Sequence, residues 1–216
     1  MRLSAVSLRR DDCGRSAGKG QGLEIMINSA VSHLASQLNQ FLKQTYGLTE
    51  DVVLMSNIVG QDGAVAPNIN NKLLVFLTNL EKDTAPFRQL QRSDAGASRS
   101  AVSSVPVYLN LYVMFAANFS GANYGEALKF ISGAIGFFQR FPVLDHQVTP
   151  DLDKRIEKLL VSIENLKIHE LSNLWTLLGG KYLPSVLYKV RMVAFDAEDV
   201  VAQVPNIRQP ATSASH

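Results

Sequence analysis

The 216-residue chain is 46% hydrophobic and 19% charged, with 21 basic and 19 acidic residues. A chain of this length and apolar content can bury one sizeable core, so we expect a single compact domain. The small basic surplus lies in the first 25 residues, and the rest of the chain is balanced in charge. Nucleic-acid-binding domains normally carry a basic surplus, so we expect no nucleic-acid partner.

Cysteine usage and hydropathy argue against a disulfide-stabilised protein and against a membrane-spanning protein. Cys13 is the single cysteine, so an intramolecular disulfide is impossible. The N-terminal segment has arginines but lacks the apolar stretch of a secretory signal. Charged residues such as Lys129 and Arg140 interrupt the apolar runs before they reach the roughly 20 residues of a spanning helix. We therefore expect no membrane span.

The first 25 residues are rich in Gly, Ser and Arg and show no periodicity, which predicts a disordered N-terminal extension. Met26 opens the first periodic segment, so we expect translation to start naturally at this residue. Residues 27–46 carry apolar side chains at helical spacing and predict an amphipathic helix. The pattern then predicts a strand over 51–59, a loop over 57–71 and a second strand over 72–80.

Residues 83–104 are dominated by Ser, Ala, Arg and Gly, a composition that predicts a long mobile loop. Residues 105–119 alternate strictly and predict the longest strand. One of its faces is wholly apolar, and the other is semi-polar and aromatic, with Tyr108, Asn110 and Tyr112.

A helix is predicted from Asn123, which together with Glu126 resembles a capping box, to the Phe141-Pro142 pair. Its expected core stripe consists of Tyr124, Ala127, Leu128, Ile131, Ala134, Ile135 and Phe138. A second apolar stripe contains Phe130, Gly133 and Phe137. This stripe is compatible with burial inside the domain or with a subunit contact, and we take both rings as candidate interface residues.

Acidic and basic residues over 151–155 suggest a helix start, and the alternation that follows predicts a strand up to about residue 163. A short helix with Trp175 on its buried stripe comes next. Gly179 or Gly180 is expected to take the left-handed conformation that ends it. Pro184 then opens a strand whose core face holds Val186, Tyr188, Val190, Met192 and Ala194. Trp175, Gly179, Gly180 and Pro184 form an architectural hinge between the helix and this strand.

The complete pattern predicts an α/β (α+β) fold, with a mixed, mostly antiparallel sheet packed against about three helices. The domain would cover residues 26–196, followed by a flexible tail over 197–216. Lys189 and Arg191 project from one face of the last strand and are candidates for contact with an acidic partner surface.

Catalytic chemistry is not indicated by any residue pattern. His33, His146, His169 and His216 are scattered, without metal-ligand spacing between them, and His33 is expected on the polar face of the first helix. Asp145-His146 is the nearest approach to an acid–base pair, and we expect it in a solvated loop. We expect no metal, no cofactor and no enzymatic activity.

Two segments carry a resemblance to a known family. The strand motif Pro106, Leu109 and Leu111 is followed by a helix that ends near Pro142. The later succession is Trp175, Leu178-Gly179, Tyr182, Pro184-Ser185, Tyr188 and Arg191. Together they resemble the tail terminator, or cap, proteins of phage-tail-like contractile injection systems. The likeness covers about residues 26–196.

The resemblance implies a hexameric ring that caps the end of the inner tube and anchors the last sheath ring. Tube and sheath proteins would be its partners. Assembly would take place in a bacterial or archaeal cytoplasm, after which the ring would be part of the injection particle. Asp199, Val200, Val201 and Val204 lie in a short β-leaning segment of the tail, and we expect this segment to pair with an edge of the sheath. The alternative is a small-molecule-binding or enzymatic domain that uses the face around Tyr108, Asn110 and Tyr112.

Overall fold

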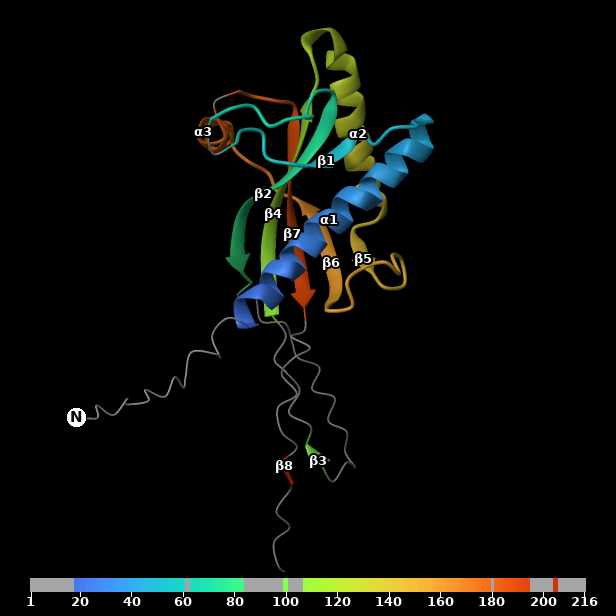
Figure 1. Ribbon diagram of the computed structural model, residues 1–216, viewed down its shortest axis with the longest axis vertical. Coiled ribbons are helices and arrows are strands. Elements are labelled where there is room, and N and C mark those ends of the chain that lie inside the picture. Colours follow the sequence, from blue (N-terminus) through green and yellow to red (C-terminus); the bar gives the residue numbers. More distant parts are fainter. Residues whose placement is uncertain are drawn as a thin grey trace, which may run out of the picture.

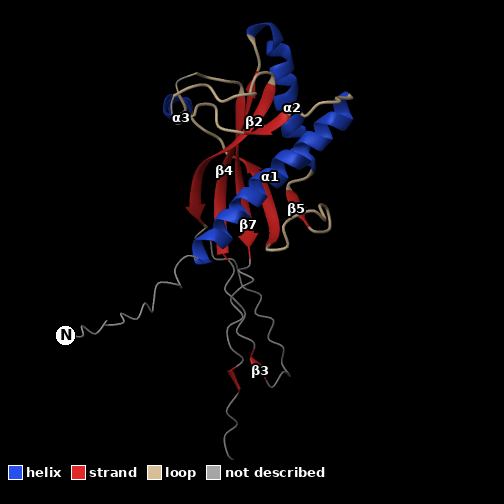
Figure 2. Ribbon diagram, viewed as in Figure 1, coloured by secondary structure: helices blue, strands red, loops and turns tan. Residues whose placement is uncertain are grey.

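A six-stranded sheet organises the protein, in strand order β1-β2-β4-β7-β6-β5 (Figures 1 and 2). A computed structural model describes residues 18–60, 63–83, 99–100, 107–179, 181–194 and 204–205. β1 pairs with β2 in parallel, and all other pairs in this sheet are antiparallel. The predicted mixed, mostly antiparallel α+β architecture is confirmed.

The strands of this sheet are β1 (Val53–Met55), β2 (Lys72–Lys82), β4 (Val107–Asn118), β5 (Val143–Asp145), β6 (Ile156–Ile163) and β7 (Ser185–Ala194). The helices are α1 (Gly18–Tyr46), α2 (Tyr124–Arg140) and α3 (Ile168–Leu177), with a short 3-10 turn, η1 (Gly121–Asn123), before α2. A separate two-stranded sheet pairs β3 (Arg99–Ser100) with β8 (Val204–Pro205). No helix among the described residues is long and apolar enough to cross a membrane.

The larger core lies between one face of the sheet and the helices α1 and α2. α1 runs diagonally across this face (Figure 2). β4 contributes the side chains that its alternation predicts, namely Leu109, Leu111, Val113, Phe115 and Ala117. β7 adds Tyr188, Val190, Met192 and Ala194, so the predicted core faces of both strands are confirmed.

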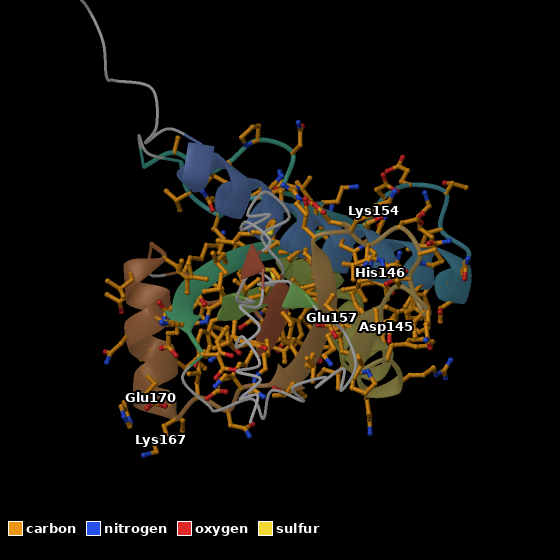
Figure 3. The ribbon with its side chains drawn as sticks, turned by 90° about the horizontal axis from the view of Figure 1, so that it is seen from below. Asp145, His146, Lys154, Glu157, Lys167 and Glu170 are labelled. Carbon is orange, nitrogen blue, oxygen red and sulfur yellow. The ribbon has the colours of Figure 1, made fainter. Side chains whose placement is uncertain are left out.

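A second, smaller core lies on the opposite face, under α3 and the loop between β1 and β2. Trp175 of α3 is buried there with Leu74, Met114 and Leu187. Seen from below, α1 and α3 lie on opposite sides of the sheet (Figure 3). α3 therefore packs on the face of the sheet opposite to α1 and α2.

α1 and α2 approach closely at Gly133. A Cβ atom at this position would lie 2.7 Å from Leu42 Cδ2 and 3.1 Å from the Tyr46 hydroxyl. Distances this short require the Leu42 side chain or α1 itself to shift in a closely packed core. The glycine that the sequence placed in the second apolar stripe of the helix is thus a contact point between two helices.

Several boundaries differ from the sequence-based expectations. α1 begins at Gly18, so residues 18–25 of the predicted extension belong to the helix. β1 is only three residues long. Asn123 makes no side-chain cap to α2, so the predicted capping box is absent there. Residues 151–155 do not start a helix and instead lead into β6. Residues 84–98 and 101–106 of the predicted loop lie outside the described residues, as do residues 195–203 and 206–216 of the tail.

Several strands begin or end at one end of the sheet. The last residue of β2, Lys82, pairs close to the first residues of β4, and Val107 of β4 pairs with Ala194, the last residue of β7. The first turn of α1 lies at the same end (Figure 1). The chain therefore leaves or enters the sheet three times at this pole.

Candidate interaction surfaces

The basic strip predicted on β7 lies in a shallow groove of about 440 Å³. Its lining combines apolar and basic side chains, from Pro142, Val143, Leu160, Val161, Ser162, Lys189 and Arg191. The register places these strand residues together because β6 and β5 flank β7 on this side. The prediction that Lys189 and Arg191 share one face is confirmed by this common lining.

The two cations of the strip differ in their environments. Arg191 Nε lies 2.6 Å from Asp83 Oδ2, and the Asp83 side chain is only 6% exposed. Lys189 holds its ammonium group 5.8 Å from the centroid of the Tyr112 ring. Because Asp83 already compensates Arg191, Lys189 is the cation of this pair that is better placed to meet an acidic partner.

The semi-polar face of β4 is engaged within the sheet. The Tyr112 hydroxyl donates to Glu81 Oε2 at 3.0 Å, and Asn79 Nδ2 donates to the other carboxylate oxygen at 3.1 Å. Burial and the Glu81 carboxylate raise the pKa of Tyr112. Asn110 is buried on the same face. Of the residues named for the alternative, small-molecule role, Tyr112 thus belongs to a network between neighbouring strands, whereas Asn110 Oδ1 is buried without a hydrogen-bond partner.

Phe130 and Phe137 lie in the core, with 4% and 5% of their surface exposed. Phe130 packs against Tyr46 and Phe119, with ring centroids 5.7 and 5.3 Å away. Phe137 packs against Phe41 at 5.1 Å. The expected subunit contact through these rings is therefore corrected to packing inside the domain. The helix presents Tyr124 and Leu128 to solvent instead.

The hinge after α3 takes the expected form at Gly179, which has a φ of +102°. Its N–H and that of Leu178 donate to carbonyl groups in the last turn of the helix. Pro184 accepts a hydrogen bond from the Ala117 N–H at 2.9 Å and thereby joins the ladder before β7 starts. Trp175 is buried beside the Tyr182 ring. Gly180 lies outside the described residues.

The polar pairs in the sequence have structural roles. Asp145 Oδ1 accepts hydrogen bonds from the N–H groups of Gln147 and Val148, and His146 Nε2 lies 2.9 Å from the carbonyl oxygen of Ile156. Both side chains lie across the molecule from Lys167 and Glu170 at the start of α3 (Figure 3). Within the described ranges, no three His, Cys, Asp or Glu side chains gather closely enough to hold a metal ion.

His33 is placed differently from its expected position. It is only 8% exposed rather than on the polar face of α1, and its Nε2 has no hydrogen-bond partner. Burial lowers its pKa, while the charge of Asp151 acts in the opposite direction and His146 adds to the lowering. The helical spacing of α1 did not reveal this, because Asp151 and His146, which act on the residue, belong to the distant segment between β5 and β6.

The sequence was compared with known protein families, and one family matches most of it. The family described as the Pvc16 N-terminal domain matches residues 30–209, which is most of the chain. The chain belongs to the Pvc16 N-terminal domain family. This match agrees with the resemblance drawn from the strand, helix and hinge motifs.

Two solved structures align with this Pvc16-type domain. One is the tube terminating cap of the anti-feeding prophage, with 14% identity and a TM-score of 0.48 over 82% of this chain and 58% of its own. The other is the sheath/tube terminator, in its extended state, of an extracellular contractile injection system called PVC. It shows 14% identity and a TM-score of 0.47 over 88% of this chain and 64% of its own. The chain thus spans less than two thirds of either protein. No curated protein sequence matches it.

Proposed function

We propose that the chain is a structural cap of a contractile injection particle. It would form a ring, six-fold as the sequence resemblance implies, on the end of the inner tube, and the same ring would hold the last sheath ring. The observation that carries this proposal is the match to the Pvc16 N-terminal domain family over residues 30–209. The role requires binding surfaces and no chemical turnover.

The architecture supports a rigid, load-transmitting role. Two cores on opposite faces fix the central strands β2, β4 and β7, and close packing leaves such a sheet little freedom to deform. The pole where β2 and β7 end and β4 begins places several chain segments at one end of this rigid body. A ring subunit can use such segments to contact its neighbours while its folded part keeps a constant shape.

The strip around Lys189 is the surface that we assign to the tube or the sheath. It combines an apolar floor with a cation, which suits a partner that presents acidic and aliphatic side chains. Arg191 is already paired with Asp83, so we give it the role of holding the end of β2 against β7.

The proposal is tested by deleting the gene in the organism that produces the particles. We expect tubes of variable length and sheaths that detach or fail to remain extended, with both properties restored by the wild-type gene. Particles of uniform length with stable sheaths in the deletion strain would refute the cap role. Electron microscopy of purified particles gives both measurements.

A further inference from the structure

The outer edge of β2 is open over half its length. β1 pairs with β2 only from Leu73 to Val75, and its last residue is Met55. β2 continues to Lys82, and in the described part of the chain no other strand joins it on that side. An open edge of this kind is a template for a further strand.

The backbone groups along this edge are directed outward. The Asp83 N–H donates to the Tyr108 carbonyl at 3.0 Å, so this pair is hydrogen-bonded across β2 and β4. Hydrogen-bonded and non-hydrogen-bonded pairs alternate in an antiparallel ladder. Leu80 and Lys82 are therefore non-hydrogen-bonded positions toward β4, and their N–H and C=O groups point to the free side.

The edge is flanked by exposed apolar side chains. Met55, Leu77 and Leu80 are 43%, 38% and 41% exposed. Next to them is a groove of about 460 Å³, which α1 lines with Ile27 and Val31. An added strand could direct every second side chain into this groove while its backbone pairs with β2.

We infer that this edge receives residues 198–204 of a second copy of the chain. The segment reads EDVVAQV. In antiparallel register with Val200 opposite Leu80, Glu198 comes beside Lys82, which is exposed. Val200 then lies on the same face as Leu80, which is the side of the groove, and the bulge of β2 between Leu77 and Asn79 interrupts the alternation beyond this point. The inference rests on the ring of the proposed function, because each subunit would donate one segment and accept another.

The pairing of β8 supports the strand character of this segment. Val204 and Pro205 already form an antiparallel pair with Arg99 and Ser100. The end of the donor segment therefore takes part in a ladder with residues 99 and 100 of its own chain.

Chain length argues for a second copy as the donor. Ala194 lies at the same pole as Lys82 but three strand spacings from the new position, which is about 14 Å. The four residue steps from Ala194 to Glu198 reach about 13–14 Å when fully extended. Residues 194–198 would have to be fully extended along a straight line, although the chain that leaves β2 and enters β4 lies in the way. The same subunit therefore cannot supply the segment in this register.

Disulfide trapping tests the inference in the full-length chain, with Cys13→Ser to remove the native thiol. We would co-express a tagged chain carrying Leu80→Cys with a differently tagged chain carrying Val200→Cys. Mild oxidation should give a crosslinked pair that holds both tags, because opposed residues bring their Cα atoms within disulfide distance. The chain that carries both substitutions should give a ladder of multimers on a denaturing gel.

Two matched variants provide controls. Val201→Cys points to the other face of the added strand and should crosslink to Leu80→Cys far less than Val200→Cys does. Leu128→Cys replaces Leu80→Cys at a leucine of similar exposure, 44%, on α2 and should give no crosslink. Equal crosslinking of Val200→Cys and Val201→Cys would overturn the register.

Three outcomes would overturn the second-copy donor. One is an intramolecular crosslink in the doubly substituted chain, and another is a crosslink that forms only with sheath protein, the partner expected from the sequence. The third is rings that persist unchanged after residues 197–216 are deleted. Capped particles without the crosslink would refute this inference and leave the cap role intact. Crosslinked rings that never join particles would refute the cap role alone.

Discussion

Gly179 is a position at which the backbone restricts the side chain. Its φ of +102° is costly for any residue with a Cβ atom, and such an atom would lie 3.1 Å from Val59 Cγ2. We expect Gly179→Ala to lower the free energy of unfolding by about 1–2 kcal/mol. Gly136→Ala is the control, because this helical position has open space around it and should gain about 0.5–1 kcal/mol. Urea denaturation of both variants measures the difference, and equal stabilities would contradict the strain.

His33 should make stability depend on pH. Burial lowers its pKa in the folded state, so the unfolded chain takes up a proton first as the pH falls below about 6.5. The free energy of unfolding should then decrease, by up to about 1.4 kcal/mol per pH unit for this one proton. Above neutral pH the two states bind the same number of protons at this site, and no such slope is expected.

Replacement of His33 by Leu should remove this part of the slope below about pH 6.5. The matched control is His169→Gln, because His169 is exposed and no comparable burial acts on it. Chemical denaturation at a series of pH values provides the measurement. If His33→Leu and the wild type show the same pH profile, the buried neutral imidazole is not the cause.

Lys189 is the cation that we assign to a partner contact. Lys189→Glu reverses the charge in the groove that Val143 and Leu160 line and should reduce recovery of the chain with purified particles by at least tenfold. Lys181→Glu is the control, since Lys181 is exposed in the segment that leads to β7. Equal recovery of both variants in particle sedimentation would remove Lys189 from the interface.

At the scale of the element, the buried face of α2 is wider than the expected core stripe and is shifted toward Phe130 and Phe137, while Tyr124 and Leu128 of the expected stripe are exposed. Phe130→Ala should cost about 3–5 kcal/mol, because it removes a ring from the contact among Tyr46, Phe119 and α2. Leu128→Ala on the same helix should cost less than about 1 kcal/mol, since its side chain is partly in water. Thermal denaturation distinguishes the two. A folded Phe130→Ala variant of unchanged stability that no longer forms rings would restore the original interface assignment.

The long strands were predictable because their period is unambiguous. The alternation of β4 and β7 leaves only one way to place Leu111 and Val190 inside. α2 has apolar residues on two adjacent stripes, and the sequence alone cannot say which one α1 will cover. The close contact at Gly133 determines which stripe α1 covers, because α1 can approach α2 most closely at the residue that has no side chain.

The remaining differences have equally local causes. The start of α1 is rich in glycine, a poor helix former, so its propensity does not reveal the helix there. β1 pairs in parallel with β2 over only three residues, a length too short for a clear period in the sequence. The candidate surfaces were only partly predictable. Lys189 and Arg191 share a face by period, whereas the Asp83 contact to Arg191 depends on tertiary structure.

At the scale of the whole molecule, the protein consists of a closely packed body and one end of the sheet at which several chain segments meet. The helices and the two cores hold the sheet, and the ends of β2 and β7 and the start of β4 meet where a neighbour could be reached. The open edge of β2 begins at this same pole. A ring built from such subunits would be stiff within each domain and joined through short segments between them, as a cap under load requires.

The most direct measurement of the cap role is the position of the chain on intact particles. A small tag added at the N-terminus, detected by gold labelling or by particle averaging in the electron microscope, locates it. The account predicts density at one end only, where the tube closes and the sheath stops, with the symmetry of a ring. Label spread along the sheath, label at the opposite end, or particles without the chain would contradict it.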